Sequence, residues 1–272
     1  MKPQTILITG CSHDGIGYAT AKHLKELGHR VFASARQQKD VDTLTAEGFD
    51  SYLIDVNNYQ QVDLALERIL KKTDGKLDVI FNNAGYCQAG ALEDIETKFL
   101  KEQFETNFFS LHNLTNQSLK IMRKQGYGKI IQHSSVLGLV SMKYRGAYNS
   151  SKYALEGLTD TMRLELAGSN IYMSTLNTGP ITSKFRENSI KTIPNVDYEN
   201  STHKQEYEKI LKKLHKPVPF NEPAISVAKV VEKIINSSKP KPRYYITKAT
   251  WISGVLKRLF STKLLDKIIS RY

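Results

Sequence analysis

The sequence predicts a single α/β domain built on a doubly wound parallel sheet. Short apolar runs alternate with segments of helical periodicity from residue 4 to residue 247. A glycine-rich turn, TGCSHDGIG at residues 9–17, follows the first apolar run. Residues 1–247 contain no internal repeat and no linker. Strand–helix–strand units of this kind produce parallel strands with helices on both faces of the sheet.

The predicted strands are short aliphatic runs that end where polar or small residues begin. Such runs favour buried strands when helices alternate with them. They span residues 4–9, 31–35, 51–54, 77–81, 129–133, 171–177 and 244–247.

The predicted helices fill the intervals between these strands. In the first of them, Ile16, Ala19, Ala21 and Leu24 recur at helical spacing, and Gly28 ends the helix. The predicted helices span residues 16–28, 39–47, 59–72, 97–124, 148–168, 203–215 and 224–236.

Residues 184–222 interrupt the alternation after the sixth predicted strand. They carry a mixed charge run and two prolines near the end. An excursion at this point of a doubly wound fold lies over the carboxyl ends of the strands, where ligands bind. We therefore expect a substrate lid; the alternative is a solvated surface insertion.

Composition narrows the classes of function. The 272 residues are 40% hydrophobic and 24% charged, as in ordinary globular proteins. Cys11 and Cys87 have no partner at metal-ligand spacing, so we expect no metal site and a reduced, cytoplasmic protein. We also expect no secretory signal and no membrane span, since no apolar run reaches about 18 residues.

The net charge of +12 is concentrated near the end of the chain. Residues 239–272 contain nine lysine and arginine residues and one aspartate, which leaves only +4 for the rest. A nucleic-acid-binding protein usually carries its charge on a folded reading surface. We therefore expect no nucleic-acid partner.

The glycine-rich turn predicts a phosphate site. A strand, this turn, a helix and a second strand lie within about 30 residues. The helix that begins after Gly15 offers free backbone N–H groups and the positive end of its dipole to a pyrophosphate.

The turn is one residue longer than a usual dinucleotide loop, because residues 11–14 separate Gly10 from Gly15. We expect a bulge at Ser12–Asp14, with Ser12 or His13 facing the cofactor. Asp14 is expected to face solvent or to cap the helix.

The end of the second strand indicates which dinucleotide binds. A site for NAD places an acidic residue there to bind the ribose 2′-hydroxyl. Here Ala35 takes that place and Arg36 follows. A guanidinium pairs with a 2′-phosphate, which favours NADP; the alternative is an ordinary surface arginine.

The pentapeptide YNSSK at 148–152 indicates acid–base chemistry. Its i,i+4 spacing places Tyr148 and Lys152 on one face of a helix. A phenol with a pKa near 10 is a poor acid–base catalyst at neutral pH, and an adjacent ammonium group favours the phenolate.

Polar residues elsewhere suit the same site. Ser134-Ser135 closes a predicted strand, where a hydroxyl could orient a carbonyl oxygen. Asn107 is a mediocre helix former inside a predicted helix, which indicates a tertiary role or a satisfied core amide. The NNAG sequence at 82–85 fits a backbone wall beside a cofactor.

Together these motifs resemble the short-chain dehydrogenase/reductase family in its shorter branch, which has a Rossmann-type fold. The resemblance covers nearly the whole chain and rests on motifs that occur in family order: TGCSHDGIG, Asp55, NNAG, Asn107, Ser135, YNSSK and TGPITS at 178–183.

The resemblance implies roles for four catalytic residues. Tyr148 would be the general acid in reduction and the base in oxidation. Lys152 would lower the pKa of that phenol and hold the nicotinamide ribose. Ser135 would orient the carbonyl, and Asn107 would hold a water that relays protons.

The resemblance also implies a set of residues that bind NADP(H). These residues are Gly10, Ser12, His13, Gly15, Ile16, Gly17, Arg36, Asp55, Val56, Asn82, Ala84, Gly85, Tyr148, Lys152, Gly179, Ile181 and Ser183. One departure concerns the nicotinamide side, where the family's usual Pro-Gly reads Thr178-Gly179 and Pro180 follows.

Within the family, SSVLGL, AYNSSKYALEG and Arg36 are similar to the hydroxysteroid/retinol dehydrogenase-like branch. The chain most resembles bacterial NADP-dependent aldehyde reductases, which also carry a tryptophan and Lys-Arg near the C-terminus, as Trp251 and Lys257-Arg258 do here. This resemblance implies an apolar aldehyde or ketone as substrate and a homo-oligomer, a dimer or tetramer.

Residues 248–272 predict a basic amphipathic helical tail. Apolar side chains recur at helical spacing in TWISGVLKRLF and again in KLLDKII, with Lys and Arg on the other face. The apolar face could pack on the body, a partner subunit or the substrate mouth. The alternative is peripheral contact with a membrane surface.

We therefore expect an NADP(H)-dependent oxidoreductase that acts on an apolar aldehyde, ketone or matching alcohol. One alternative is a hydroxysteroid, retinol or acyl-ketone lipid reductase. A second is a sensor or scaffold that binds NADP without turnover.

Overall fold

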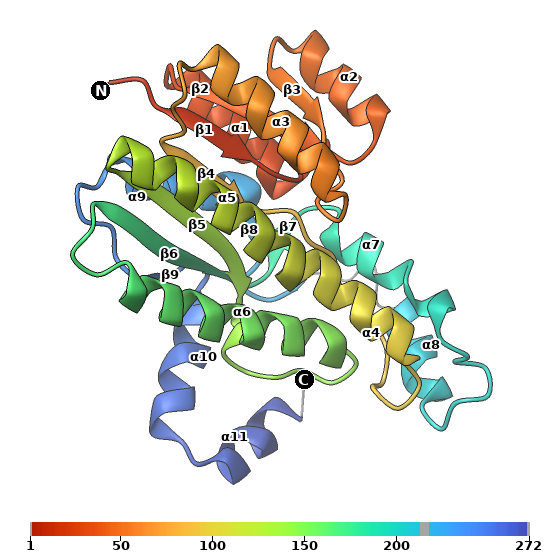
Figure 1. Ribbon diagram of the computed structural model, residues 1–272. Helices are drawn as coiled ribbons and strands as arrows, with labels where there is room; N and C mark the ends of the chain where they lie inside the picture. The colour runs from red at the N-terminus through yellow and green to blue at the C-terminus, as the bar shows by residue number, and fades with distance from the viewer. Residues whose placement is uncertain (1, 213–217, 271–272) are drawn as a thin grey trace.

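Seven parallel strands form the sheet at the centre of the molecule (Figure 1). The computed structural model describes residues 2–212 and 218–270. The strands lie in the order β3-β2-β1-β4-β5-β6-β9. They are β1 (Thr5–Ile8), β2 (Arg30–Ala35), β3 (Asp50–Leu53), β4 (Val79–Asn82), β5 (Gly128–Ser135), β6 (Ile171–Thr178) and β9 (Arg243–Tyr245). The predicted doubly wound sheet in one domain is confirmed.

The strand order reverses between β1 and β4, which are neighbours in the sheet. The chain builds outward from β1 to β3, then returns to start the other half at β4. Their register pairs Ile6 with Val79 and Ile8 with Phe81. The crevice outside the carboxyl ends of two such strands is where doubly wound folds bind ligands.

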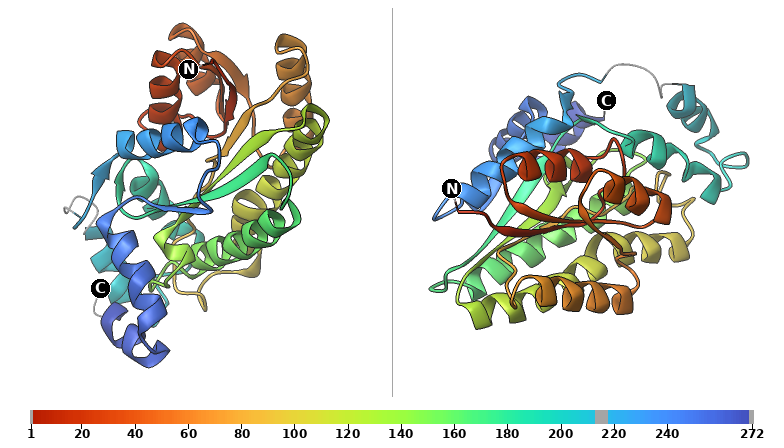
Figure 2. Two further views of the ribbon diagram at one scale, coloured as in Figure 1. Left: turned by 90° about the vertical axis from the view of Figure 1, so that its left-hand side faces the viewer. Right: turned by 90° about the horizontal axis from the view of Figure 1, so that it is seen from above.

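Two layers of helices cover the sheet, as the view from above shows (Figure 2). Side chains on β1 alternate between the layers, because Ile6 and Ile8 join one core and Leu7 joins the other. The first layer holds α1 (Ile16–Glu26), α2 (Gln38–Ala46) and α9 (Ala224–Asn236). The second holds α3 (Tyr59–Lys72), α5 (Ser110–Gln125) and α6 (Gly146–Glu165).

The long helix predicted at 97–124 is interrupted. α4 (Thr97–Phe104) and α5 are joined by a π-helical turn, Glu105–Phe109. A π-turn fits one extra residue into the helix and changes the direction of side chains on either side of it. Periodicity alone cannot show this turn, and it contains Asn107.

The segment predicted as a lid packs on the body rather than standing free in solvent. Ile190, Ile193 and Tyr207 join a buried cluster with Ala89 and Ala147. The segment contains β7 (Ile181–Thr182), α7 (Phe185–Ile190), a 3₁₀ turn at Ile193–Asn195, α8 (Lys204–Lys212) and β8 (Glu222–Pro223). The end of the helix predicted at 203–215 lies outside the described residues.

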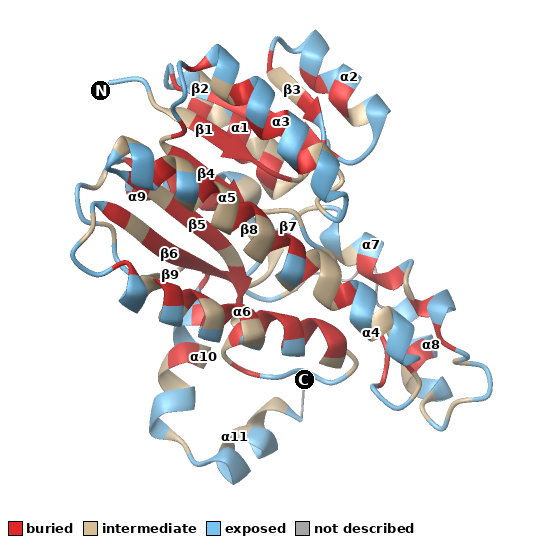
Figure 3. Ribbon diagram, viewed as in Figure 1, coloured by how far each residue is buried: buried red, intermediate tan, exposed pale blue. Residues whose placement is uncertain are grey.

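The tail forms two helices, α10 (Lys248–Leu259) and α11 (Thr262–Ile269). They extend away from the sheet below α6 in Figure 1. Colouring by burial shows a red and tan α10 near its start and no red in α11 (Figure 3).

Candidate active site

The glycine turn packs against the end of β4 so closely that side chains do not fit. Gly10 has φ +73°, and a Cβ there would lie 2.9 Å from the Cα of Ala84. A Cβ on Gly17 would lie 2.5 Å from the carbonyl oxygen of Gly10 and 2.6 Å from Nδ2 of Asn83. The structure therefore leaves a backbone-lined turn at the N-terminus of α1, which fits a pyrophosphate.

The extra residue of the turn forms a bulge, as predicted. The N–H of Gly15 donates to the carbonyl of Ser12 at 3.0 Å, which closes a tight turn, and Asp14 takes a left-handed backbone with φ +63°. The predicted helix cap by Asp14 is wrong, because Gly15 occupies the N-cap position without a side-chain hydrogen bond. The predicted exposure of Asp14 is confirmed.

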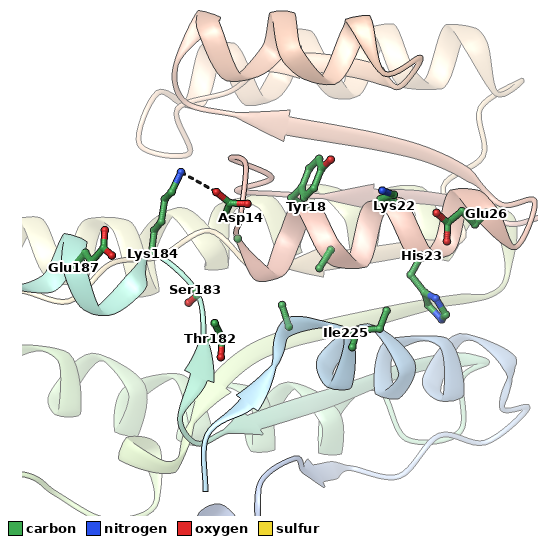
Figure 4. Close-up of a pocket in the computed structure, with 13 residues that line it drawn as sticks. Asp14, Tyr18, Lys22, His23, Glu26, Thr182, Ser183, Lys184, Glu187 and Ile225 are labelled. Carbon is green, nitrogen blue, oxygen red and sulfur yellow. Dashed lines mark ion pairs between the residues drawn. The ribbon is translucent and has the colours of Figure 1, made fainter. Parts of the chain in front are cut away.

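Asp14 connects the turn to the lid segment. Its carboxylate lies 3.1 Å from Nζ of Lys184 and 3.0 Å from Nδ1 of His13. Lys184, and then His13, lower the pKa of Asp14. Figure 4 shows the Asp14–Lys184 pair at one end of a groove along α1, which Tyr18 and Lys22 also line. The four predicted catalytic residues do not line this groove.

Ser12 and His13 are both exposed on the turn. The His13 ring lies 4.9 Å from the ring of Tyr18, on the outer side of α1. Contacts of the Ser12 and His13 side chains with a cofactor stay predictions. Gly15 and Ile16, at the start of α1, are half-buried.

The adenosine side of the predicted site lies at the ends of β2 and β3. Ala35 is buried and Arg36 is exposed directly after it. Among the described residues, no carboxylate forms an ion pair with Arg36 that would compete for a phosphate. Asp55 accepts a hydrogen bond from the N–H of Asn57 at 3.0 Å, and Val56 beside it is half-buried.

The four residues of the NNAG sequence, at the end of β4 and after it, differ in their surroundings. The Asn82 side chain is buried and donates to Oγ1 of Thr115 and Oε1 of Gln132, both at 2.9 Å. Its amide therefore holds β4 to its neighbours, and any cofactor contact would come from its backbone. The N–H of Ala84 donates to Oγ1 of Thr9 at 3.0 Å, and Gly85 is exposed.

Asn83 and His133 form a polar hub that the sequence interpretation missed. Nδ2 of Asn83 donates to the carbonyls of Thr9 and Gly10, at 2.8 and 3.0 Å. Its Oδ1 lies 2.9 Å from Nδ1 of His133, and Nε2 of His133 lies 3.1 Å from Oγ1 of Thr178. The hub joins the glycine turn to the ends of β5 and β6. The only signal was a pair of asparagines at a strand end.

This environment keeps His133 neutral. Burial, and then the nearby charge of Lys152, lower the pKa of His133 to about 3. Because Nδ2 of Asn83 already donates elsewhere, Oδ1 accepts, and we assign the ring proton to Nδ1 of His133. The Thr178 hydroxyl can then donate to Nε2.

The four predicted catalytic residues come from three elements that meet at the carboxyl edge of the sheet. Ser135 ends β5, Tyr148 and Lys152 lie in the first turns of α6, and Asn107 lies in the π-turn. All four are buried, with at most 7% of the residue surface exposed. The structure therefore gathers them in one site.

Hydrogen bonds fix these side chains. Nζ of Lys152 donates to the carbonyl of His133 at 2.7 Å and lies 5.5 Å from the centroid of the Tyr148 ring. Oδ1 of Asn107 accepts from the N–H of Tyr86 at 3.1 Å, and its Nδ2 donates to Ser151 Oγ at 3.2 Å. The π-turn thereby ties Asn107 to the segment after β4 and to α6.

Burial is the largest influence on the pKa values of Tyr148 and Lys152. It raises the pKa of Tyr148, against smaller lowering effects from a hydrogen bond with Ser135 and from the charge of Arg145. It lowers the pKa of Lys152 to about 8, and the nearby charge of Glu156 opposes this shift. The structure therefore does not show the lowered phenol pKa that the Tyr–Lys spacing predicts.

Three further side chains surround Tyr148. The ring of Phe185, at the start of α7, lies 5.5 Å from the Tyr148 ring. Nη1 of Arg145 donates to Oγ of Ser189 at 2.7 Å. Cys87 is buried nearby, where burial raises the pKa of its thiol against the effects of Arg145 and Ser189. Arg145 could have been identified from the sequence as a neighbour of Tyr148, because it lies three residues before it.

The predicted nicotinamide side lies against the tail. A Cβ on Gly179 would lie 2.0 Å from Oγ1 of Thr247, so close packing with the start of α10 explains this glycine. Ile181 and Ser183 are half-buried beside it. Their contact with a nicotinamide amide stays a prediction.

Comparison with known proteins identifies the family of this chain. Residues 4–193 match the family of short chain dehydrogenases. The chain belongs to this family. A relative named "Uncharacterized oxidoreductase YbbO" from Escherichia coli is 39% identical to this short-chain dehydrogenase over 269 residues, 98% of this chain and 94% of the relative. The resemblance inferred from the motifs and the class of oxidoreductase are confirmed.

Two further relatives are named for specific reductions. A 3-ketodihydrosphingosine reductase from Bacteroides thetaiotaomicron is 36% identical over 204 residues, 74% of each chain. An NADPH-dependent 3-dehydrocapnine reductase from Ornithobacterium rhinotracheale is 28% identical over 270 residues, 96% of this chain and 94% of the relative.

Solved structures confirm the Rossmann-type fold. A short-chain dehydrogenase from Streptomyces avermitilis superposes with a TM-score of 0.81 at 23% identity, over 99% of this chain and 98% of the other. ElxO, solved with NADP bound, superposes with a TM-score of 0.70 at 25% identity, over 90% and 97% of the two chains.

Residues 2–212 and 218–270 contain neither a membrane-spanning helix nor a cluster of metal ligands. No helix there combines the length and the apolar character needed to cross a bilayer. Within the same ranges, no three His, Cys, Asp or Glu side chains are grouped so that they could hold a metal ion.

Proposed function

We propose that this short-chain dehydrogenase reduces an apolar aldehyde or ketone with NADPH and oxidises the matching alcohol in reverse. The observation that carries the proposal is the buried phenol of Tyr148, which is hydrogen-bonded to Ser135 and packs against the ring of Phe185. A proton donor, a second hydroxyl and an aromatic wall together suit a carbonyl group on an apolar substrate.

The cofactor is NADP(H). Arg36 follows a buried alanine where an NAD site would place an acid, and the glycine turn is shaped for a pyrophosphate. A relative named NADPH-dependent and a structure solved with NADP agree with this assignment. The residues that would hold it are the predicted set, from Gly10 to Ser183. When bound, the cofactor supplies the hydride for reduction.

The remaining chemistry belongs to the side chains of the site. Tyr148 gives its phenolic proton to the carbonyl oxygen, and the Ser135 hydroxyl donates a hydrogen bond to the same oxygen. Lys152 would hold the ribose of the cofactor and, by its charge, stabilises the phenolate that Tyr148 becomes when it gives up its proton. Asn107 positions a water through which the proton returns to Tyr148.

The substrate could also be a larger lipid ketone. Two relatives are named for reduction of a keto or dehydro compound, 3-ketodihydrosphingosine and 3-dehydrocapnine. The phenylalanine above Tyr148 and the exposed apolar tail favour substrates with a long apolar part. A hydroxysteroid, a retinol or an acyl ketone is therefore the alternative substrate.

The alternative is a sensor or scaffold that binds NADP without turnover, and the presence of all four predicted catalytic residues, each of them buried, argues against it. We also propose a cytoplasmic homo-oligomer, a dimer or tetramer, on the family resemblance.

A substrate panel with matched variants tests the proposal. Aldehydes, retinoids, steroids and acyl ketones are assayed with NADPH and with NADH. Tyr148→Phe should reduce the turnover rate by at least about 100-fold while NADPH still binds, because only the proton donor is lost. Tyr153→Phe, an exposed tyrosine on the same helix, is the control and should keep activity. Full activity of Tyr148→Phe would refute the proposed mechanism.

A further inference from the structure

The two tail helices leave an apolar surface uncovered. Trp251 is 62% exposed, Ile252 42%, Leu259 73% and Leu264 43%, and α11 contains no buried residue. Scattered single apolar residues are ordinary on a protein surface, but four within fourteen residues concentrate apolar surface on these two helices. We call Trp251, Ile252, Leu259 and Leu264 the tail patch.

The opposite side of α10 anchors the tail to the body. Thr250 and Gly254 are buried, and a Cβ on Gly254 would lie 2.6 Å from Cε2 of Tyr245. Nζ of Lys257 lies 4.4 Å from the centroid of the Tyr153 ring on α6. At about 100° per residue, these three positions share one side of the helix, Ile252 and Leu259 lie on the opposite side, and Trp251 lies on the flank between them. The α10 part of the patch therefore faces away from the body.

The α11 helix continues the same pattern. Leu264, Leu265, Ile268 and Ile269 fall within one arc of the helix, and Lys263 and Lys267 fall on the opposite arc. Leu265, Ile268 and Ile269 are only half-buried. In Figures 1 and 3, α11 hangs from the end of α10 with much of its surface exposed.

The charge around the patch is predominantly positive. Residues 248–270 contain five lysine and arginine residues and one aspartate. Within the described residues, none of these five cations takes part in a salt bridge. A second copy of this chain seated on the patch would bring equal basic surfaces together, which costs energy. An anionic lipid surface instead complements the cations and accepts the apolar side chains.

We propose that α10 and α11 dock this protein on the surface of an anionic lipid bilayer. The tail patch enters the interfacial region, and Arg258, Lys263 and Lys267 contact lipid phosphates. Since Thr247, which caps the start of α10, lies beside Gly179, and α10 also contacts the turn after Ser135, docking holds the catalytic edge of the sheet near the bilayer. This last point rests on the proposed function, whereas docking itself does not.

Vesicle flotation with the full-length protein tests docking. The probes are vesicles of phosphatidylglycerol with phosphatidylcholine, and vesicles of phosphatidylcholine alone. Wild type should float with the anionic vesicles at low salt and much less with the neutral ones. Lys263→Gln with Lys267→Gln should weaken binding to anionic vesicles about tenfold or more, because each surface lysine contributes about 1 kcal/mol.

The apolar part is tested by Leu259→Glu with Leu264→Glu, which should abolish flotation. Leu27→Glu with Leu64→Glu adds the same charge at leucines that are 43% and 53% exposed in the N-terminal third, and it should leave flotation unchanged. Activity on a water-soluble aldehyde should be equal in all variants, so failure of docking is distinguishable from failure of the reductase assignment. Absence of wild-type flotation would overturn the proposal. A loss of oligomer mass in Leu259→Glu with Leu264→Glu, without a change in flotation, would also overturn it and assign the patch to a second copy.

Discussion

Nζ of Lys152 lies 5.5 Å from the centroid of the Tyr148 ring, one helical turn away, and donates its 2.7 Å hydrogen bond to the carbonyl of His133. The ammonium group is thus held by the backbone of β5 rather than by a carboxylate. Because the ammonium group is buried, its charged form is destabilised. This arrangement places a stability cost at the candidate active site.

The buried charge of Lys152 should lower the stability of the fold at neutral pH. The folded pKa of Lys152, about 8, is below the unfolded value of about 10.4, so the charged form destabilises the fold. The penalty, about 3 kcal/mol, is complete below pH 8 and disappears as pH rises from 8 to 10.4. The lost hydrogen bond from the charged ammonium group is worth about 2 kcal/mol, so Lys152→Met should be about 1 kcal/mol more stable than wild type at pH 7.

Urea unfolding of both proteins at pH 7 and pH 10 measures this difference. The advantage of Lys152→Met should shrink or reverse at pH 10, while its activity is lost at both values. A difference in unfolding free energy that is equal at the two pH values would contradict the prediction.

Arg36 should select the cofactor. Arg36→Asp removes the predicted partner of the 2′-phosphate and adds a repelling charge, so the Kd for NADPH should rise about 10- to 100-fold, the equivalent of one charged hydrogen bond. The Kd for NADH should change little or fall. Fluorescence titration measures both, and Lys39→Gln, another exposed cation on the following helix, serves as the control. An equal loss for both cofactors would show that Arg36 does not read the phosphate.

The Asp14–Lys184 pair should slow cofactor release, because it joins the glycine turn to the lid segment. Lys184→Gln should raise the dissociation rate of NADPH about twofold to fivefold, in the range of an exposed ion pair. The wild-type rate should approach the mutant rate at high salt, since exposed pairs are screened. Stopped-flow displacement measures the rates, with Lys191→Gln as the control in the same segment. Identical rates at low salt would rule out such a link.

Gly17 should be intolerant of any side chain. Its Cβ would lie 2.5 Å from the carbonyl oxygen of Gly10, so Gly17→Ala must displace the glycine turn and should abolish NADPH binding. Gly157→Ala on α6 meets no atom within 4 Å and should stabilise the fold slightly, by at most about 1 kcal/mol. Calorimetric titration and thermal unfolding of both variants check this contrast. Normal NADPH affinity in Gly17→Ala would refute the tight packing of the turn.

Local patterns were sufficient for most elements, because strand and helix periodicities depend on neighbours along the chain. The helix at 59–72 and the helix at 224–236 agree with the structure at both ends. The glycine turn and the candidate site residues Ser135, Tyr148 and Lys152 could be identified from the sequence, since each motif carries its chemistry in a fixed short spacing. The π-turn at 105–109 was not predictable, because the bonds from Asn107 to Tyr86 and Ser151 cross between elements.

The sequence by itself determined the alternation of strands and helices and the family, and it supplied the four predicted catalytic residues. Only the tertiary structure decided how these parts meet. It paired Asn83 with His133, placed Phe185 against Tyr148, and joined Asp14 to Lys184. It also left the tail patch uncovered. The physical reason is that these contacts join residues 37 to 170 positions apart along the chain. The burial that shifts the pKa values of Tyr148 and Lys152 likewise arises from the packing of several elements at once.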